Sequence, residues 1–542
     1  MLLPLLRNYA YCPAVIRPVA LVLGVLVVLV GCSAPTAPGG AAGAVADPTR
    51  MVLADGYEPE SLHPLLGYGV EGASKIFDGL VAHDADRQLQ PALAAELPVA
   101  APDLLSYTVA LRAGVTFHDG SAFDAQDVVA TYSALLDPAY ASSIRSDWVT
   151  LAGVEALDAH TVRFRLGRPD SAFPHRLTLG IVPAEAVATP APLETSAFST
   201  QPIGTGPYRL AEWRRGTSMR LEANPAYFGG APAVRTLDLV FAIDDNTRAQ
   251  RLKAGEFDGT VLPPALADTF AGSGYAVLHH PTADYRTVTL PTAHPVTGDP
   301  AVRLALNFAV DRRGMIDALF AGHGEPASTP IPQVLAEYAE PSAQFRFDRA
   351  EAERILDAGG WVRGPDGTRV RDGVPARFTL MYAASDSIRR DLAQAFTSDA
   401  RAVGVDVLLE GLGWEAIEPR MGADALVLGG GSPFDPDLVS YPLLHSSYGG
   451  DGFNNPAFYS NPAVDAGLDA ARRAPDQATR VAAVKEWQRA YAAAPGFVFL
   501  TFLDHSYLVR ERWDGYQQVV DPHSHGTTWG PWWNVEDWTP RP

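Results

Sequence analysis

Two short stretches have residue types and spacing that could support catalysis or cofactor binding. Residues 67–72 read Gly-Tyr-Gly-Val-Glu-Gly and match the Gly-x-Gly-x-x-Gly pattern of dinucleotide sites, but that pattern directly follows a strand and here residues 58–64 intervene. Residues 430–434, Gly-Gly-Ser-Pro-Phe, lack the last glycine of a serine nucleophile elbow. Pro433 also removes the backbone N–H that an oxyanion hole would need. We therefore predict no catalytic residues and no enzymatic activity.

Histidines could bind a ligand directly, through a metal ion. The chain has 13 of them, and the close groupings are His279-His280 and His523-Ser-His525. No free thiolate is expected once the N-terminal signal sequence described below has been removed and Cys32 lipidated, so a metal would find only nitrogen and oxygen ligands. A solvated loop is the simpler interpretation of His523 and His525, so we predict no resident metal and no cofactor.

Two glycine-containing segments could instead line a cleft that binds a ligand without reacting with it. In residues 68–71, Gly69 lets a ligand approach the backbone and Tyr68 offers an aromatic wall with a hydroxyl. The second segment is 429–437, and its Asp435-Pro-Asp437 unit is also typical of a turn or helix cap, which is the favoured interpretation there. The predicted ligand-binding residues are Tyr68, Gly69, Val70, Glu71, Trp414, Gly431, Ser432, Pro433, Phe434 and Asp435.

The composition excludes several classes of protein. Lys and Arg total 42 against 62 Asp and Glu, a formal net charge of −20, so no nucleic-acid partner is expected. Hydrophobic residues make up 47% of 542, enough for the cores of several domains. Only one stretch is continuously apolar, which excludes a polytopic membrane protein.

That apolar stretch gives residues 1–31 the features of a lipoprotein signal peptide. It runs from Val19 to Val30, shorter than the roughly 20 residues of a membrane span. Leu29-Val-Gly-Cys32 resembles a bacterial lipobox, whose cysteine is lipidated. Residues 32–47 are rich in Ala, Gly and Pro and form a flexible tether. We predict a body held by a lipid on Cys32 at the extracytoplasmic (periplasmic) side of the cell membrane; an uncleaved anchor helix is the alternative.

Strands and helices alternate along the rest of the chain and must position the cleft segments. Arg50–Ala54 is typical of a strand, and Asp124 and Asp299 stand as N-caps before amphipathic helices. We expect the helix after Asp299 to continue through Leu319, and Ser74–Leu80 to be part of another helix. The pattern predicts a mixed α/β protein.

A set of motifs follows one order along the chain. They are Tyr57–Leu66, Ile76–Leu80, Leu89–Ala94, Leu111–Gly120, Asp124–Val128, Gly204–Tyr208, Asn224–Phe228, Val302–Asp311, Asp435–Asp437 and Gly452–Asn455. Together they resemble the family 5 extracytoplasmic solute-binding proteins, which serve peptide and nickel ABC importers. The resemblance covers nearly all of the mature chain and extends to dipeptide-binding lipoproteins of actinobacteria.

The resemblance implies an α/β, two-lobed, periplasmic-binding-protein-like clamshell of class II type, with a hinge. Lobe I would cover residues 48–290, with a subdomain inserted at about 76–200. Lobe II would cover 291–494, and residues 495–542 would return to lobe I.

The resemblance also implies a function, which is capture of short peptides between the lobes and delivery to an ABC permease pair and its ATPase subunits. The receptor is expected to be a monomer. In peptide-binding members an aspartate just before the Asp-Pro turn holds the α-ammonium group, but that position here is Ser432. The amine could be held by Glu71, by Asp435 or by backbone carbonyls, or the ligand lacks a free amine. Two alternatives stay open: a receptor for a metal chelate or haem on the same fold, and an extracytoplasmic hydrolase.

Overall fold

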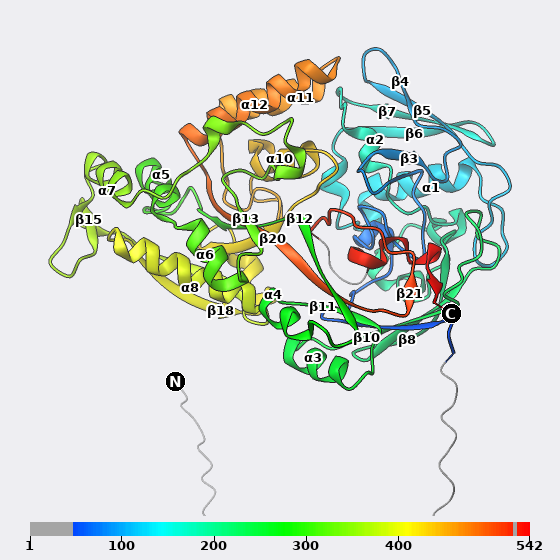
Figure 1. The fold of residues 1–542 in the computed structure, drawn as a ribbon. Coiled ribbons are helices and arrows are strands. Elements are labelled where there is room, and N and C mark those ends of the chain that lie inside the picture. The colour runs from blue at the N-terminus through cyan, green and yellow to red at the C-terminus, as the bar shows by residue number, and fades with distance from the viewer. Residues whose placement is uncertain (1–46, 524–527, 542) are drawn as a thin grey trace, which may run out of the picture. The chain divides into compact units, whose positions relative to one another are not determined.

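A large mixed sheet organises the protein (Figure 1), whose computed structural model describes residues 47–523 and 528–541. Cys32 and the signal peptide lie outside the described residues. Across the sheet the strands are β18 (Asp406–Leu412), β17 (Arg377–Ala383), β19 (Ala425–Gly430), β12 (Tyr275–Thr289), β20 (Phe497–Arg510), β11 (Gly259–Leu262), β1 (Arg50–Asp55), β10 (Thr236–Phe241), β9 (Ser218–Ala223) and β8 (Tyr208–Arg214), with β13 (Gly324–Pro326) paired to β20.

The long antiparallel strands β12 and β20 connect two parts of this sheet that come from different stretches of the chain. On one side are parallel strands drawn from residues 50–262, and on the other parallel strands drawn from 377–430. The pairing of β12 with β20 shifts between Pro281 and Tyr285, a bulge that bends the ladder. Residues at this bulge lie beside the second predicted cleft segment in the sheet, because Tyr285 pairs with Gly430.

Smaller sheets and the helices cover the large sheet. A four-stranded sheet consists of β4 (Val99–Ala100), β5 (Ser106–Ala110), β7 (Thr161–Leu166) and β6 (Leu151–Asp158). The short pairings are β2 (Val81–His83) with β3 (Leu89–Pro91), β15 (Arg369–Arg371) with β14 (Val362–Arg363) and β16 (Val374–Pro375), and β21 (Trp513–Asp514) with β22 (Thr539–Pro540). The helices are α1 (Ala125–Leu136), α2 (Phe173–Arg176), α3 (Asp245–Lys253), α4 (Pro264–Ala267), α5 (Pro300–Ala309), α6 (Arg312–Phe320), α7 (Arg349–Ala358), α8 (Ser387–Ala402), α9 (Trp414–Ile417), α10 (Asp437–Leu444), α11 (Pro462–Arg473) and α12 (Gln477–Ala493). No helix in the described ranges is long and apolar enough to cross a membrane.

The helix starts predicted at Asp124 and Asp299 are confirmed, but the single helix predicted after Asp299 is divided into two helices. The Asp124 side chain accepts from the Gln126 backbone N–H at 2.7 Å and starts α1, and Asp299 starts α5. The expectation of one helix through Leu319 is wrong, because Val310 is extended and Asp311 caps a second helix, α6. A cap residue inside an apolar periodic stretch therefore ended the first helix.

The expectation of a helix over Ser74–Leu80 is also wrong, because backbone groups of this segment form hydrogen bonds with distant segments instead of with each other. The carbonyls of Lys75 and Ile76 accept from the N–H groups of Tyr208 and Gly206 at 2.8 and 2.9 Å. Its side chains are buried on several sides rather than along one helical face, with Ile76 and Leu80 fully buried. Apolar spacing alone did not distinguish this extended core segment from a helix.

Buried hydrophobic residues form distinct clusters that follow the two parts of the sheet. The largest joins residues 51–237 with Tyr507, Trp513, Trp532 and Trp538 near the C-terminus. Two further clusters are built from residues 285–503. The C-terminal residues thus pack with the N-terminal part of the chain, while the lobe boundaries stay predictions.

The close approach of Gly431, which follows β19, to the backbone of β12 generates a first prediction. Gly431 has a φ of +139°, and a Cβ there would lie 1.7 Å from the carbonyl oxygen of Ala283; Gly216 has a φ of +70° with nothing within 4 Å. We expect Gly216→Ala to cost about 1–2 kcal/mol from backbone strain alone. Gly431→Ala should cost at least about 2 kcal/mol more, because strain and overlap add. Urea unfolding of both variants measures the difference, and equal losses would contradict the close approach.

Candidate functional site

The first predicted segment is a loop whose shape depends on its glycines. Gly67 and Gly69 have φ values of +96° and +67°, and a Cβ on Gly69 would lie 2.8 Å from the Cβ of Ser74. The Thr178 hydroxyl donates to the Val70 carbonyl oxygen at 3.0 Å and fixes the loop next to α2. The loop therefore holds the following residue, Glu71, at a defined position.

Val70 and Glu71 line a cavity of about 210 Å³, and Phe434 from the second predicted segment lines it too. The sequence analysis assigned two segments more than 350 residues apart to one cleft, and the fold does bring residues of both to the same cavity. The charged or titratable residues lining this cavity are Glu71, His83, Asp147, His175 and Arg176.

The other predicted residues lie in different surroundings. Tyr68 and Gly69 line a neighbouring cavity of about 420 Å³. Gly431 and Pro433 are buried and line neither cavity. Trp414 is also away from both, since its ring packs against Phe453 and under the guanidinium of Arg389, 5.1 Å from the ring centroid.

Glu71 and Ser432, one from each segment, meet at the site. Burial raises the pKa of Glu71 to about 8, and a hydrogen bond with Ser432 lowers it in part. In the described part of the chain, no Arg or Lys forms an ion pair with Glu71. At neutral pH the carboxyl group is therefore mostly protonated, and an approaching cation would ionise it.

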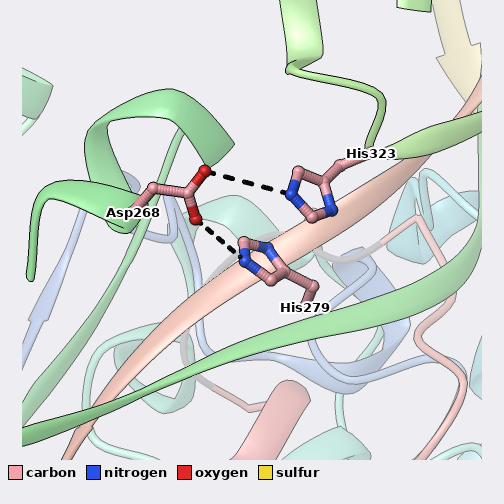
Figure 2. A group of neighbouring side chains, drawn as sticks. All are labelled: Asp268, His279 and His323. Carbon is pink, nitrogen blue, oxygen red and sulfur yellow. Dashed lines mark hydrogen bonds and ion pairs between the residues drawn. The ribbon is translucent and has the colours of Figure 1, made fainter. Parts of the chain in front are cut away.

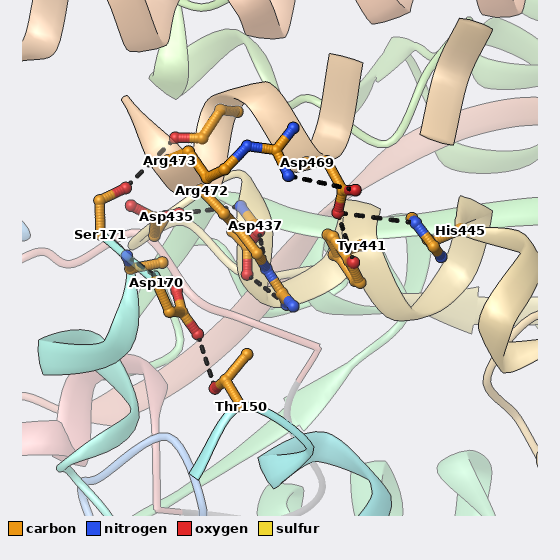
Figure 3. Close-up of polar contacts among 12 residues, drawn as sticks. Thr150, Asp170, Ser171, Asp435, Asp437, Tyr441, His445, Asp469, Arg472 and Arg473 are labelled. Atoms are coloured by element: carbon orange, nitrogen blue, oxygen red, sulfur yellow. Dashed lines mark hydrogen bonds and ion pairs between the residues drawn. The ribbon is translucent and has the colours of Figure 1, made fainter. Parts of the chain in front are cut away.

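The two aspartates of the 435–437 turn are already neutralised by arginines (Figure 3). Arg480 donates to both oxygens of Asp435 at 2.7 and 2.6 Å. Arg472 donates twice to Asp437, at 2.7 and 2.8 Å, as drawn in Figure 3, and Arg176 adds a contact at 3.1 Å. Although burial alone would raise it, Arg472 and its neighbours hold the pKa of Asp437 at about 2. The charge of each carboxylate is thus compensated by arginine within the protein, which makes both poor partners for a ligand amine.

Hydrogen bonds join residues 146–171 to residues 448–472 beside the cavity. The Ser171 N–H donates to the Arg472 carbonyl at 3.0 Å, and the Asn454 amide donates to Asp147 at 3.1 Å. Tyr448 donates through its hydroxyl to the carbonyl of Ser146 at 3.1 Å. These contacts, with the Arg176–Asp437 pair, close the cavity on this side.

His83 and His175 line the cavity and were missed by the sequence analysis. The His83 ring stacks on Phe434 with centroids 3.8 Å apart, and its Nε2 lies 3.0 Å from the Nδ1 of His175. Burial lowers the pKa of His83 to about 3, with a further contribution from His175, whose own pKa is lowered by burial. Both imidazoles are neutral at pH 7. Two single histidines 92 residues apart carry no spacing signal that could have predicted the pair.

The solvated-loop interpretation is wrong for His523. Its backbone N–H donates to the Gly431 carbonyl at 2.8 Å, and its Nδ1 lies 2.7 Å from a carboxylate oxygen of Asp284, which is buried. His523 thus supports the back of the 429–437 segment. His525 lies outside the described residues.

Comparison with known proteins assigns the class. The model for bacterial extracellular solute-binding proteins, family 5, matches residues 88–451. Protein XP55 of Streptomyces lividans is 47% identical over 485 residues, covering 89% of each chain. The oligopeptide-binding protein AppA of Bacillus subtilis is 28% identical, covering 76% of this chain and 78% of that protein.

Two solved structures have the same fold. NikZ from Campylobacter jejuni in complex with Ni(L-His) gives a TM-score of 0.82 at 27% identity, covering 91% of this chain and 100% of that one. AppA from Bacillus subtilis in complex with a nonapeptide gives 0.80 at 25% identity, covering 91% and 99%. The fold is therefore the two-lobed α/β fold of periplasmic binding proteins. The chain belongs to the family 5 extracellular solute-binding proteins, as the motifs predicted.

The buried ion pairs generate a second prediction. Asp435→Asn removes one partner of a pair in which Asp435 is 2% exposed and should cost about 3–5 kcal/mol, because Arg480 is left uncompensated. Asp317→Asn is the matched control, since that carboxylate is 60% exposed in an i,i+4 pair with Arg313 and should cost under about 0.5 kcal/mol. Urea unfolding compares them. A loss in Asp435→Asn no larger than in the control would contradict a stabilising role for the pair.

Proposed function

We propose that this protein is a lipid-anchored receptor that captures short peptides and delivers them to an ABC permease pair with its ATPase subunits. The observation that carries the proposal is Glu71, a half-buried carboxyl group at the cavity that meets the Ser432 hydroxyl and has no cationic partner in the described residues. A peptide's α-ammonium group would supply the missing charge. We infer no catalytic role for any residue of the cavity.

The rest of the cavity suits a peptide. Arg176 lines it as well, so a zwitterion would find in one small space a carboxyl group that its ammonium group can ionise and a cationic side chain. Its volume of about 210 Å³ is smaller than typical drug-sized pockets, which favours short ligands. The name of AppA, an oligopeptide-binding protein, supports the same class of ligand.

A metal chelate is the second candidate ligand, favoured by a different observation. The neutral imidazoles of His83 and His175 line the cavity, and neutral imidazole is the form that binds metals. NikZ, which shares the fold, was solved with Ni(L-His).

Native mass spectrometry of the protein purified without refolding distinguishes the two ligands. Bound species separated by amino-acid residue masses and displaced by added dipeptides to pentapeptides would support the peptide receptor. A nickel or porphyrin mass would favour the chelate. An empty protein whose melting temperature is unchanged by a peptide mixture would contradict the peptide receptor.

The pKa of Glu71 predicts how peptide affinity changes with pH. Because the ammonium group binds the carboxylate form and the pKa is about 8 in the free protein, affinity should rise about tenfold from pH 6 to pH 7. The rise should stop near pH 8, where the α-amino group of the peptide itself loses its proton. Glu71→Gln keeps the polar contact with Ser432 and should bind weakly with no such slope. Calorimetry at each pH measures both.

Asp147 provides the matched control, since it is the other carboxyl group at the cavity and already accepts from Asn454 near the charge of Arg176. Asp147→Asn should keep the pH slope of the native protein. A slope that survives in Glu71→Gln and disappears in Asp147→Asn would move the amine site to Asp147 and contradict the assignment to Glu71.

The anchor is tested separately at Cys32. We expect the native chain to incorporate a labelled fatty acid in a bacterial host and to stay with the membrane fraction. Cys32→Ser should lose the label and be released by the same cells. Membrane retention of the Cys32→Ser variant would instead indicate an uncleaved anchor helix.

A further inference from the structure

Three side chains outside both cavities converge on one point at the surface (Figure 2). Asp268 begins a short 3₁₀ turn, Asp268–Phe270, His279 lies on β12, and His323 lies in the turn between α6 and β13. The Nε2 of His279 is 3.1 Å from one oxygen of Asp268, and the Nε2 of His323 is 4.0 Å from the other. One ligand atom from each residue lies within 4.8 Å of the others.

In both histidines the Nε2 atom faces Asp268, and the other ring nitrogen, Nδ1, faces a different polar group. The Nδ1 of His279 is 2.8 Å from the hydroxyl of Ser506, and the Nδ1 of His323 is 3.9 Å from a carboxylate oxygen of Asp504. The hydrogen bond between Ser506 and the Nδ1 of His279 orients that ring as metal-binding histidines usually are, through the nitrogen that does not bind the metal.

The charges of the cluster favour a cation. In the described ranges, Asp268 and Asp504 form ion pairs with these two histidines and with no Arg or Lys. Protonating both rings would place two positive charges face to face, because their centroids are 3.7 Å apart at an interplanar angle of 16°. A divalent ion between the Nε2 atoms neutralises both carboxylates without that repulsion.

We propose that Asp268, His279 and His323 form a binding site for one divalent transition-metal ion. Two imidazole nitrogens and a carboxylate oxygen suit Zn²⁺, Ni²⁺, Cu²⁺ or Co²⁺, whereas Ca²⁺ and Mg²⁺ prefer oxygen ligands throughout. Bonds of about 2.0–2.2 Å in a tetrahedral site place ligand atoms about 3.3–3.6 Å apart. The three ligand atoms lie within 4.8 Å of one another, so they need to approach by at most about 1.5 Å. Gly322 and Gly324 on either side of His323 make its turn adaptable.

The site would work independently of the ligand cavity. None of its residues lines either cavity. The bound ion would link the 3₁₀ turn at Asp268, which precedes β12, to the turn at His323, which follows it, and so fix two segments against the long strand between them. The carboxylate of Asp268 is 45% exposed, so an ion has access and a fourth position stays open to water.

Zn²⁺ titration of the full chain tests the site, using a tag without histidine and prior removal of metals with a chelator. Calorimetry and native mass spectrometry should give one Zn²⁺ per chain, and Co²⁺ should give the visible absorption of a tetrahedral site. His279→Asn, His323→Asn and Asp268→Asn should each weaken Zn²⁺ binding at least tenfold. His160→Asn, which removes an exposed histidine elsewhere, should leave it unchanged, and Ca²⁺ should not compete.

Without metal, the variants should have the melting temperature of the native chain, because the substituted side chains are at the surface. Zn²⁺ should raise the melting temperature of the native chain and of His160→Asn, but not that of the three site variants. Zn²⁺ binding that persists in the His279→Asn, His323→Asn double variant would overturn the proposal, and so would a native chain that binds no Zn²⁺ at millimolar concentration.

Discussion

Pairing of the Asp435 and Asp437 carboxylates with three arginines is the constraint on which the rest of the site depends. Arg480 takes both oxygens of Asp435, and Arg472 with Arg176 takes those of Asp437. Buried charges are tolerated only when paired in this way, and each pair fixes the start of α10 and thus the position of Phe434. Because these carboxylates are occupied, the uncompensated carboxyl group next to the turn is Glu71.

The same pairs connect ligand binding to the contact between segments far apart in the chain. Arg176 comes from α2 and Asp437 from α10, so their ion pair forms only when the two segments meet beside the cavity. Excluding water there strengthens every polar contact, as the proposed capture of a small zwitterion requires. The bulge between Pro281 and Tyr285, on the strands that link the two parts of the sheet, lies beside the 429–437 segment.

Motifs and caps made the family, the mixed α/β class and the starts of α1 and α5 predictable, because these depend on local residue types. The segment at Ser74–Leu80 and the break at Val310 were not, since tertiary hydrogen bonds and a competing cap decide them. At the site, Glu71, Ser432 and Phe434 could be chosen from their segments. Histidine pairs could not, because His83 with His175 and His279 with His323 are brought together only by the fold.

Calorimetry with one dipeptide in two forms, with a free and with an acetylated amino terminus, tests the central claim most directly. If the Glu71 carboxyl group holds the ligand's ammonium group, the free dipeptide binds and releases a proton at pH 7, while the acetylated form binds at least about tenfold more weakly and releases none. Equal affinity for the two forms, with no proton release, would contradict the account.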